Sequence, residues 1–160
     1  MLNKVIKSDN EWRMLLTPEQ YRITREKGNE PARSGRYHNF NGTGVYLCVC
    51  CGSRLFSSRE KFPTPEKWPT FWAPIGPRNV KTSREIFDFM FRREVLCSRC
   101  DAHLGYVFDD GQPPTGDRYV INSAALSFQE NCLRARRPDI VGMHPPVPSL
   151  PAYSGAYSPA

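Results

Sequence analysis

Four cysteines stand in two pairs that have the spacing of metal ligands. Cys48 and Cys51 are separated by two residues, and so are Cys97 and Cys100. This spacing lets both sulfurs of a pair turn toward one point. Two pairs can then surround one Zn²⁺ with four thiolates, with Zn–S bonds of about 2.3 Å, sulfurs about 4 Å apart and no open position for water. The sequence therefore predicts a structural Zn²⁺ site that joins two distant segments of the chain.

The residues next to these pairs refine the prediction. Gly52 and Asp101 follow the second cysteine of each pair, and both residue types tolerate the positive φ that completes such a turn. Cys50 lies inside the first pair and is predicted to be a packed thiol rather than a ligand. Disulfides and free core thiols remain as alternatives, and the metal-ligand spacing favours zinc over both.

The composition is typical of one globular domain. The chain has 160 residues, six cysteines and a formal charge of +6, and a chain of this length can bury roughly two thirds of its unfolded surface. Three disulfides in a secreted protein would also use six cysteines, but we find neither a signal-like leader nor a transmembrane segment. The expectation is therefore an intracellular, reducing compartment. Basic residues are thinly spread, so nucleic-acid binding is permitted but not indicated.

Two capping boxes predict short helices near the N-terminus. The first pairs Ser8 with Glu11, and the second pairs Thr17 with Gln20 and has proline at the first helical position. The second helix is expected to run to about Lys27 and to stop at the glycine that follows.

Short strands are predicted from residue 44 onward. Residues 45–47 lead into the first cysteine pair, and the phenylalanines at 87, 89 and 91 alternate with other residues, which is the period of a strand. Residues 103–108, 118–122 and 124–128 are further candidates, with glycine and proline between them. Two small helices followed by many short strands favour a mainly β fold of antiparallel sheets.

The composition changes near Leu133. After Asp139 the chain contains no lysine, arginine, aspartate or glutamate, and prolines recur. Such a segment should be extended and without a core of its own. We therefore expect an N-terminal extension at 1–7, a zinc domain at 8–132 and an extended Pro-rich arm at 133–160. The arm's apolar side chains suit a groove on a protein partner: Ile140, Val141, Leu150, Tyr153 and Tyr157.

Besides both cysteine pairs, the chain contains a series of specific motifs: Glu11-Trp12, Leu16-Thr17-Pro18-Glu19-Gln20-Tyr21, Thr24-Arg25-Glu26-Lys27-Gly28, Ser34-Gly35 with Tyr37, Trp68-Pro69-Thr70-Phe71, Ala102-His103-Leu104-Gly105, Phe108-Asp109-Asp110-Gly111, Pro114-Thr115-Gly116 and Arg118-Tyr119. Through these motifs, roughly residues 7–130 resemble the B-type methionine-R-sulfoxide reductase family. The resemblance implies that family's fold: two antiparallel sheets in a tent-like arrangement, short N-terminal helices, and a structural zinc on the face away from the active site.

The resemblance also implies where a substrate would bind. In the family a tryptophan holds the substrate methyl group, and Trp68 matches it. Two histidines assist binding and proton delivery; His103 matches the first, and Tyr106 stands at the second. Arg118 and Asn122 match the residues that flank the nucleophile. Trp68, His103, Arg118 and Asn122 are therefore expected to form a vestigial pocket.

Position 120 departs from the family pattern. The family segment reads Arg-Tyr-Cys-Ile-Asn-Ser, and its cysteine attacks the sulfoxide sulfur and becomes a sulfenic acid. Here the cysteine is replaced by Val120, and an isopropyl group cannot act as a nucleophile. A resolving cysteine that some relatives carry is replaced by Glu66. With Tyr106 as the third degenerate position, we expect no catalytic residue at this site.

These losses predict a catalytically inactive member of the family. Its role would be that of a structural subunit or adaptor, docked into a larger assembly through the arm at 133–160. By analogy at the level of fold, that assembly would be a mitochondrial respiratory or ribosomal complex. One alternative is a residual peptide methionine-R-sulfoxide reductase or redox protein that uses Cys132 or Cys50. A further alternative is a sensor that binds sulfoxides without turnover.

Overall fold

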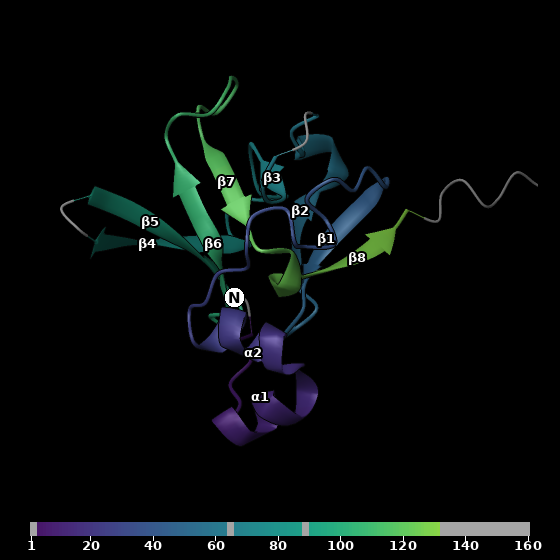
Figure 1. Cartoon of the computed structure of the whole chain (residues 1–160), viewed down its shortest axis with the longest axis vertical. Helices are drawn as coiled ribbons and strands as arrows, with labels where there is room; N and C mark the ends of the chain where they lie inside the picture. The colour runs from purple at the N-terminus through teal and green to yellow at the C-terminus, as the bar shows by residue number, and fades with distance from the viewer. Residues whose placement is uncertain (1–2, 64–65, 88–89, 132–160) are drawn as a thin grey trace, which may run out of the picture.

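The computed structural model describes residues 3–63, 66–87 and 90–131, without the side chains of 85–92. Two antiparallel sheets diverge from a shared base like the sides of a tent, and two short helices lie below that base (Figure 1). None of the helices in these ranges is long and apolar enough to cross a bilayer. The arm expected at 133–160, and Cys132 before it, lie outside the described residues.

Both predicted helices are present. Helix α1 spans Asp9–Leu15 and helix α2 spans Pro18–Arg25, each with a complete capping box at its start. The Thr17 hydroxyl accepts from the N–H of Gln20 at 3.2 Å, and the Gln20 side chain accepts from the N–H of Thr17 at 3.0 Å. Helix α2 ends earlier than predicted, because Lys27 rather than the following glycine adopts the positive φ, at 55°.

The strands form two separate sheets. A three-stranded sheet has the order β2-β1-β8, and a five-stranded sheet has the order β3-β7-β6-β5-β4. All neighbouring strands are antiparallel, which confirms the predicted mainly β class. The strands are β1 Gly44–Cys48, β2 Arg54–Ser57, β3 Thr70–Phe71, β4 Val80–Phe87, β5 Met90–Cys97, β6 His103–Phe108, β7 Arg118–Ile121 and β8 Leu126–Glu130, and 3-10 turns η1 Ser58–Glu60 and η2 Ser123–Ala125 connect them.

Two strand predictions need correction. The alternating phenylalanines at 87, 89 and 91 are not one strand, because Phe87 ends β4 and Met90 begins β5. Alternation by itself cannot detect a hairpin that reverses the chain within it. The segment predicted as a strand at 124–128 begins instead as the turn η2, and β8 starts at Leu126.

Aromatic side chains fill the space between the sheets. Phe71 of β3 stacks on Phe56 of β2, with ring centroids 4.5 Å apart, and meets Tyr46 of β1 edge-on at 5.1 Å. These three side chains are fully buried, and burial raises the pKa of Tyr46 to about 12. Tyr119 of β7 extends the layer toward Phe56, at 5.8 Å. One face of the larger sheet is thus used for the core, and its other face remains for a site.

The N-terminal segment lies against the second cysteine turn. The N–H of Val5 donates to the carbonyl of Arg99 at 2.9 Å, and the Arg99 side chain donates to the carbonyl of Asn3 at 3.1 Å. Val5 also packs partly against the core. Residues 3–7, which we expected as an extension, therefore contact the folded domain.

The N-cap of α2 offers a test of how much this helix contributes to stability. Thr17→Ala removes the hydroxyl that satisfies a helix N–H, so the free energy of unfolding should fall by about 1 kcal/mol. Thr17→Ser keeps that hydroxyl and is the matched control. Urea denaturation should show a lower midpoint for the alanine variant only; equal midpoints for the two variants would contradict the prediction.

Candidate functional site: a four-cysteine cluster and a pocket on the larger sheet

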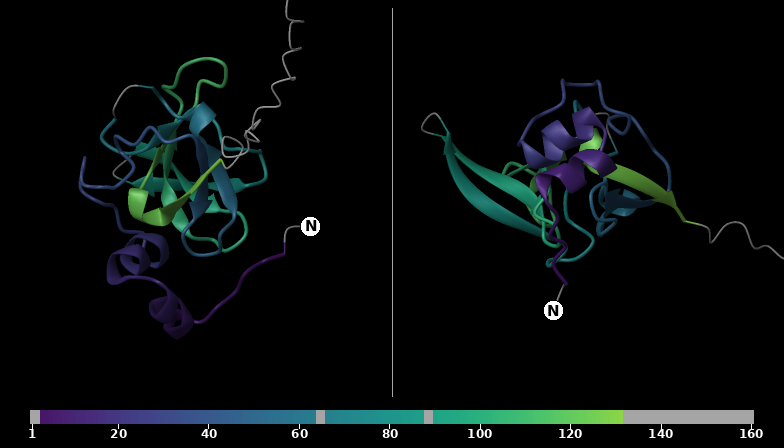
Figure 2. Two further views of the ribbon diagram at one scale, coloured as in Figure 1. Left: turned by 90° about the vertical axis from the view of Figure 1, so that its right-hand side faces the viewer. Right: turned by 90° about the horizontal axis from the view of Figure 1, so that it is seen from below.

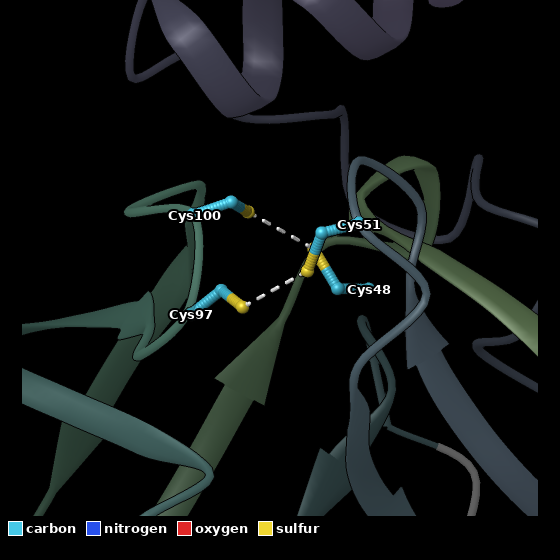
Figure 3. Close-up of side chains that lie close together, drawn as sticks. All are labelled: Cys48, Cys51, Cys97 and Cys100. Carbon is cyan, nitrogen blue, oxygen red and sulfur yellow. Dashed lines mark hydrogen bonds between the residues drawn. The ribbon is translucent and has the colours of Figure 1, made fainter. Parts of the chain in front are cut away.

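The four predicted cysteines converge at the base of the two sheets. Their sulfurs all lie within 4.8 Å of one another, and the pairs Cys48–Cys100 and Cys51–Cys97 are each 3.6 Å apart (Figure 3). A Zn–S bond of about 2.3 Å gives tetrahedral edges of about 3.8 Å, so modest shifts of the sulfurs complete the geometry. The residues present fit a metal ion held by four thiolates.

Both cysteine turns have the predicted backbone. Gly52 and Asp101 adopt φ values of 73° and 60°. Their N–H groups donate back to the carbonyls of Cys48 and Cys97, at 2.8 and 2.9 Å. Positive φ at Asp101 is uncommon for a residue with a side chain. The aspartate is held there by Lys4 and Lys81, whose ammonium groups lie 2.7 and 2.6 Å from its carboxylate.

The guanidinium of Arg25 lies beside the thiols. Both terminal nitrogens of Arg25 donate to the carbonyl of Cys100 at 3.0 Å, and one of them lies 3.6 Å from its sulfur. The thiols share protons: the hydrogen bond with Cys100 raises the pKa of Cys48 well above its ordinary value, while that with Cys100 lowers the pKa of Cys97 to about 7. A bound dication would replace the shared protons, because a coordinating thiol is deprotonated.

A second site lies on the face of the larger sheet that the core does not use. Antiparallel register places Thr70, Val120, Tyr106 and Glu94 opposite one another in a row across β3, β7, β6 and β5, and directly paired residues share a face. A cavity of about 490 Å³ opens over this row. It is lined by Asn29, Glu66, Lys67, Trp68, Thr70, Tyr106, Phe108, Arg118, Val120, Ile121 and Asn122.

The cavity collects most of the site residues predicted from the sequence. Trp68, Arg118 and Asn122 line it, and so do the three positions that depart from the family pattern, Val120, Tyr106 and Glu66. His103 does not line it. This side chain is buried, with Nδ1 2.6 Å from a carboxylate oxygen of Glu94.

Arg118 is held at the rim of the cavity. Its guanidinium donates two hydrogen bonds to Asp110, at 2.8 and 2.9 Å, and lies over the ring of Phe108. This pairing raises the pKa of Arg118 and lowers the pKa of the Asp110 carboxyl. The rim therefore carries a fixed guanidinium beside an apolar wall.

Glu30, which sequence reasoning did not identify, organises the pocket. Its buried carboxylate accepts from the N–H groups of Ser123 and Ala124, at 2.6 and 3.1 Å. Its own N–H donates to Asn122 Oδ1, and its carbonyl accepts from the indole N–H of Trp68, each at 3.0 Å. One residue thus connects two pocket side chains to the start of η2. No local pattern marks it, because its partners are 38 to 94 positions away in the sequence.

Among the described residues, the spare thiol Cys50 does not line the pocket. Cys50 is half-buried at the cysteine cluster, where it interacts with Cys48, Cys100 and Thr24. Cys132 lies beyond the described residues. The last residue before it, Asn131, is anchored by a hydrogen bond from its N–H to the carbonyl of Thr43, at 3.1 Å.

The fold and these two sites define a class: a two-sheet β domain, closed at its base by a four-cysteine cluster, with a tryptophan pocket on the outer face of the larger sheet. A family model described as the SelR domain matches residues 16–130. The chain therefore belongs to the SelR domain family.

Two bacterial proteins are similar over nearly their whole length, and a plant protein over part of its length. A "Peptide methionine sulfoxide reductase MsrB" of Hahella chejuensis is 52% identical over 127 residues, which is 79% of this chain and 91% of the relative. A protein of the same name in a Synechococcus species is 49% identical over 123 residues, or 77% and 90%. "Peptide methionine sulfoxide reductase B1, chloroplastic" of Arabidopsis thaliana is 56% identical over 122 residues, or 76% and 60%.

These comparisons correct the functional prediction. A catalytically inactive structural subunit was expected, yet relatives about half identical to the chain are named as reductases. The prediction gave decisive weight to the single side chain of Val120, whereas most of the pocket around it is retained. A mitochondrial setting has no support from these relatives, one of which is named as chloroplastic.

The role of Glu30 can be tested by removing its side chain. Glu30→Ala leaves two backbone N–H groups at the start of η2 without their acceptor, and should lower the free energy of unfolding by about 2–4 kcal/mol. Glu26→Ala, which removes an acid in a long, exposed pair with Arg13, should change it little. Thermal unfolding of the two variants gives the comparison; similar melting temperatures would refute an organising role for Glu30.

Proposed function

We propose that this chain is a peptide methionine-R-sulfoxide reductase whose attacking thiol comes from outside position 120. The observation that carries the proposal is the cavity over the larger sheet, which gathers Trp68, Arg118 and Asn122 in one place. The names of the similar proteins support the same chemistry. The pocket binds and orients the sulfoxide, and a separate cysteine reduces it.

The pocket suits a methionine sulfoxide side chain. Trp68 offers a flat apolar wall for the methyl group, and its indole is fixed by the hydrogen bond to Glu30. Val120 and Phe108 extend this wall along the sheet. Arg118 and Asn122 are polar groups near the wall, which is the usual arrangement of a small-molecule site: mostly apolar, with few polar groups that set orientation.

The reaction requires a thiolate that attacks the sulfoxide sulfur. The sulfoxide oxygen leaves with the cysteine as a sulfenic acid, and methionine is released as its thioether. A dithiol then condenses with the sulfenic acid to form a mixed disulfide and water, and its second thiol restores the cysteine. We assign the attacking thiol to Cys132 rather than Cys50, because Cys50 is packed against the metal cluster.

We also propose that the metal in the four-cysteine cluster is Zn²⁺. Four thiolates in a closed set are the usual ligands of structural zinc. The ion would link the turn after β1 to the turn after β5, so its binding free energy would contribute directly to folding. It would have no part in the reaction, because its four protein ligands leave no position for substrate.

The metal assignment predicts one Zn²⁺ per chain. Cys97→Ser removes a ligand, so it should abolish stoichiometric zinc and unfold much of the β domain. Cys50→Ser removes the spare thiol and should keep both zinc and fold. Elemental analysis of the purified variants, together with circular dichroism, would decide; zinc retained by Cys97→Ser or lost from Cys50→Ser would show that the ligand set is wrong.

The catalytic assignment predicts slow reduction of methionine-R-sulfoxide in a peptide, with dithiothreitol as reductant. Cys132→Ser should abolish turnover, and Cys50→Ser should leave it unchanged. Chromatographic measurement of the thioether product tests both. Turnover that survives in Cys132→Ser would overturn the assignment of the thiol, and a wild-type chain with no turnover above the dithiothreitol background would overturn the reductase proposal.

A thiol placed in the pocket provides an independent check. Val120→Cys should raise turnover at least tenfold, because the nucleophile then stands beside the bound sulfoxide instead of approaching from elsewhere. Val120→Ser has a similar shape but a poor nucleophile, and should not. No gain in the cysteine variant would mean that the pocket does not hold the sulfoxide in a reactive position.

A further inference from the structure

A fifth sulfur lies against the four-cysteine cluster. Cys50 is half-buried, and its thiol is close enough to those of Cys48 and Cys100 to share hydrogen bonds with them. A tetrahedral ion takes four thiolates, and the four that converge come from the two predicted pairs. The Cys50 sulfur therefore has no bond to the metal in the proposed zinc site, although it contacts two of the ligands.

Cys50 is also more accessible to solvent than the two sulfurs that it contacts. Cys48 and Cys100 are only 1% and 3% exposed, whereas Cys50 and Cys51 are half-buried. Cys51 belongs to the ligand set, so its sulfur shares an electron pair with the metal and is a weaker nucleophile. Among the described cysteines, Cys50 thus combines partial exposure with a sulfur that the metal does not occupy.

The end of helix α2 holds Cys50 and Cys100 close together. Thr24 contacts the Cys50 thiol. The next residue, Arg25, donates two hydrogen bonds to the carbonyl of Cys100, each at 3.0 Å, and lies over the ring of Trp12. Both sulfurs are therefore held against the same helix end, although they come from different turns of the chain.

We propose that Cys50 is a site of oxidation by hydrogen peroxide, and that it then forms a disulfide with Cys100 that releases the metal from the cluster. The inference rests on the proposed zinc and goes beyond the proposed reductase, because neither thiol takes part in that reaction. Cys100 is the expected partner, since Cys50 and Cys48 are only two residues apart in one turn, where a disulfide of normal geometry is hard to close.

The chemistry consumes one peroxide for each disulfide. The Cys50 sulfur attacks one peroxide oxygen and breaks the O–O bond, which gives a sulfenic acid and water. The Cys100 sulfur then attacks the sulfenic sulfur, so the S–S bond forms and the second oxygen leaves as water with a proton from solvent. The two sulfurs together lose the two electrons that peroxide gains, and a dithiol reverses the oxidation by thiol–disulfide exchange.

The disulfide changes how the two sheets are joined. With Cys100 withdrawn, three thiolates remain and the site holds a metal ion less tightly. The new bond still connects the turn after β1, which carries Cys50, to the turn after β5, which carries Cys100. The base of the tent therefore stays linked while the metal is absent, and reduction restores the full ligand set.

Metal release and disulfide formation can be measured on the same sample. The full zinc-loaded chain is treated with a small excess of hydrogen peroxide, and released metal is followed with a zinc-binding chromophore. Disulfides are then mapped by tandem mass spectrometry of tryptic peptides, since cleavage after Arg99 separates Cys97 from Cys100. The wild type should release its zinc, contain the Cys50–Cys100 disulfide, and rebind zinc after treatment with dithiothreitol.

Two serine variants isolate the role of Cys50. Cys50→Ser removes the proposed oxidation site, and Cys132→Ser is the control that removes the other thiol outside the ligand set. At equal peroxide, zinc should leave Cys50→Ser about tenfold more slowly than the wild type, because susceptibility to oxidation follows exposure and the remaining sulfurs are ligands. Cys132→Ser should release zinc at the wild-type rate.

The outcomes are distinct. Release with a Cys50–Cys100 disulfide, slowed in Cys50→Ser only, supports the inference. Equal release from the wild type and Cys50→Ser overturns it, and so does a map in which the ligand cysteines pair only with one another. If Cys50→Ser fails to fold, the map of the wild type decides alone.

Failure of the inference can be told from failure of the proposed functions. A wild type that contains zinc and keeps it in peroxide refutes the inference and leaves the proposed metal standing. A wild type purified without zinc refutes both. Neither result bears on the reduction of methionine sulfoxide, which is measured separately through its thioether product.

Discussion

The convergence of four thiols at the base of the two sheets is the constraint on which the rest of the structure depends. One pair of cysteines follows β1 in the three-stranded sheet, and the other follows β5 in the five-stranded sheet. Within the described residues the two sheets share no strand, so the cysteine cluster and the aromatic layer connect them. The two views in Figure 2 show how the helices lie beneath this junction. By fixing the angle between the two sheets, this junction determines which way each face of the larger sheet points.

The aromatic layer then determines which face of that sheet packs into the core and which face is left for a site. Phe71 and Tyr119 point toward the smaller sheet, so the alternate positions, Thr70 and Val120, must point the other way. The segment after α2 partly covers that outer face, where Lys27 and Glu30 contact β5 and η2. The pocket is therefore formed by a rigid sheet on one side and by a segment held through hydrogen bonds on the other.

In the proposed enzyme, valine at position 120 separates substrate binding from attack by the thiol. The side chain at a strand position beneath the pocket can be either a nucleophile or part of an apolar wall. Valine is well suited to the wall, because β-branched side chains pack favourably on a sheet. The groups that would bind and orient the substrate remain around it, and the comparisons join the chain to named reductases. The pocket and the attacking thiol are thus separate parts of the proposed enzyme.

Much of this protein is determined by local sequence. The two capping boxes, the positive φ at Gly52 and Asp101, the choice of Cys51 over Cys50, and strand β6 at His103–Phe108 are all confirmed. Each depends on residues within a few positions of one another, so spacing and residue type suffice to predict it. The convergence of the two cysteine pairs was also predictable, because thiols in this spacing need a common ion.

Only the tertiary structure decided how the pocket is built. Glu30 and Glu94 are both buried, and their hydrogen-bond partners come from segments far away in the sequence. The reversal between β4 and β5 was hidden in the alternating phenylalanines, because the alternation does not show that Phe87 and Phe91 belong to different strands. His103 is buried beside Glu94 and does not line the cavity, and a register shift between β5 and β6 lies next to it. The register between distant strands and the burial of charged side chains depend on the whole fold, so no single stretch of sequence predicts them.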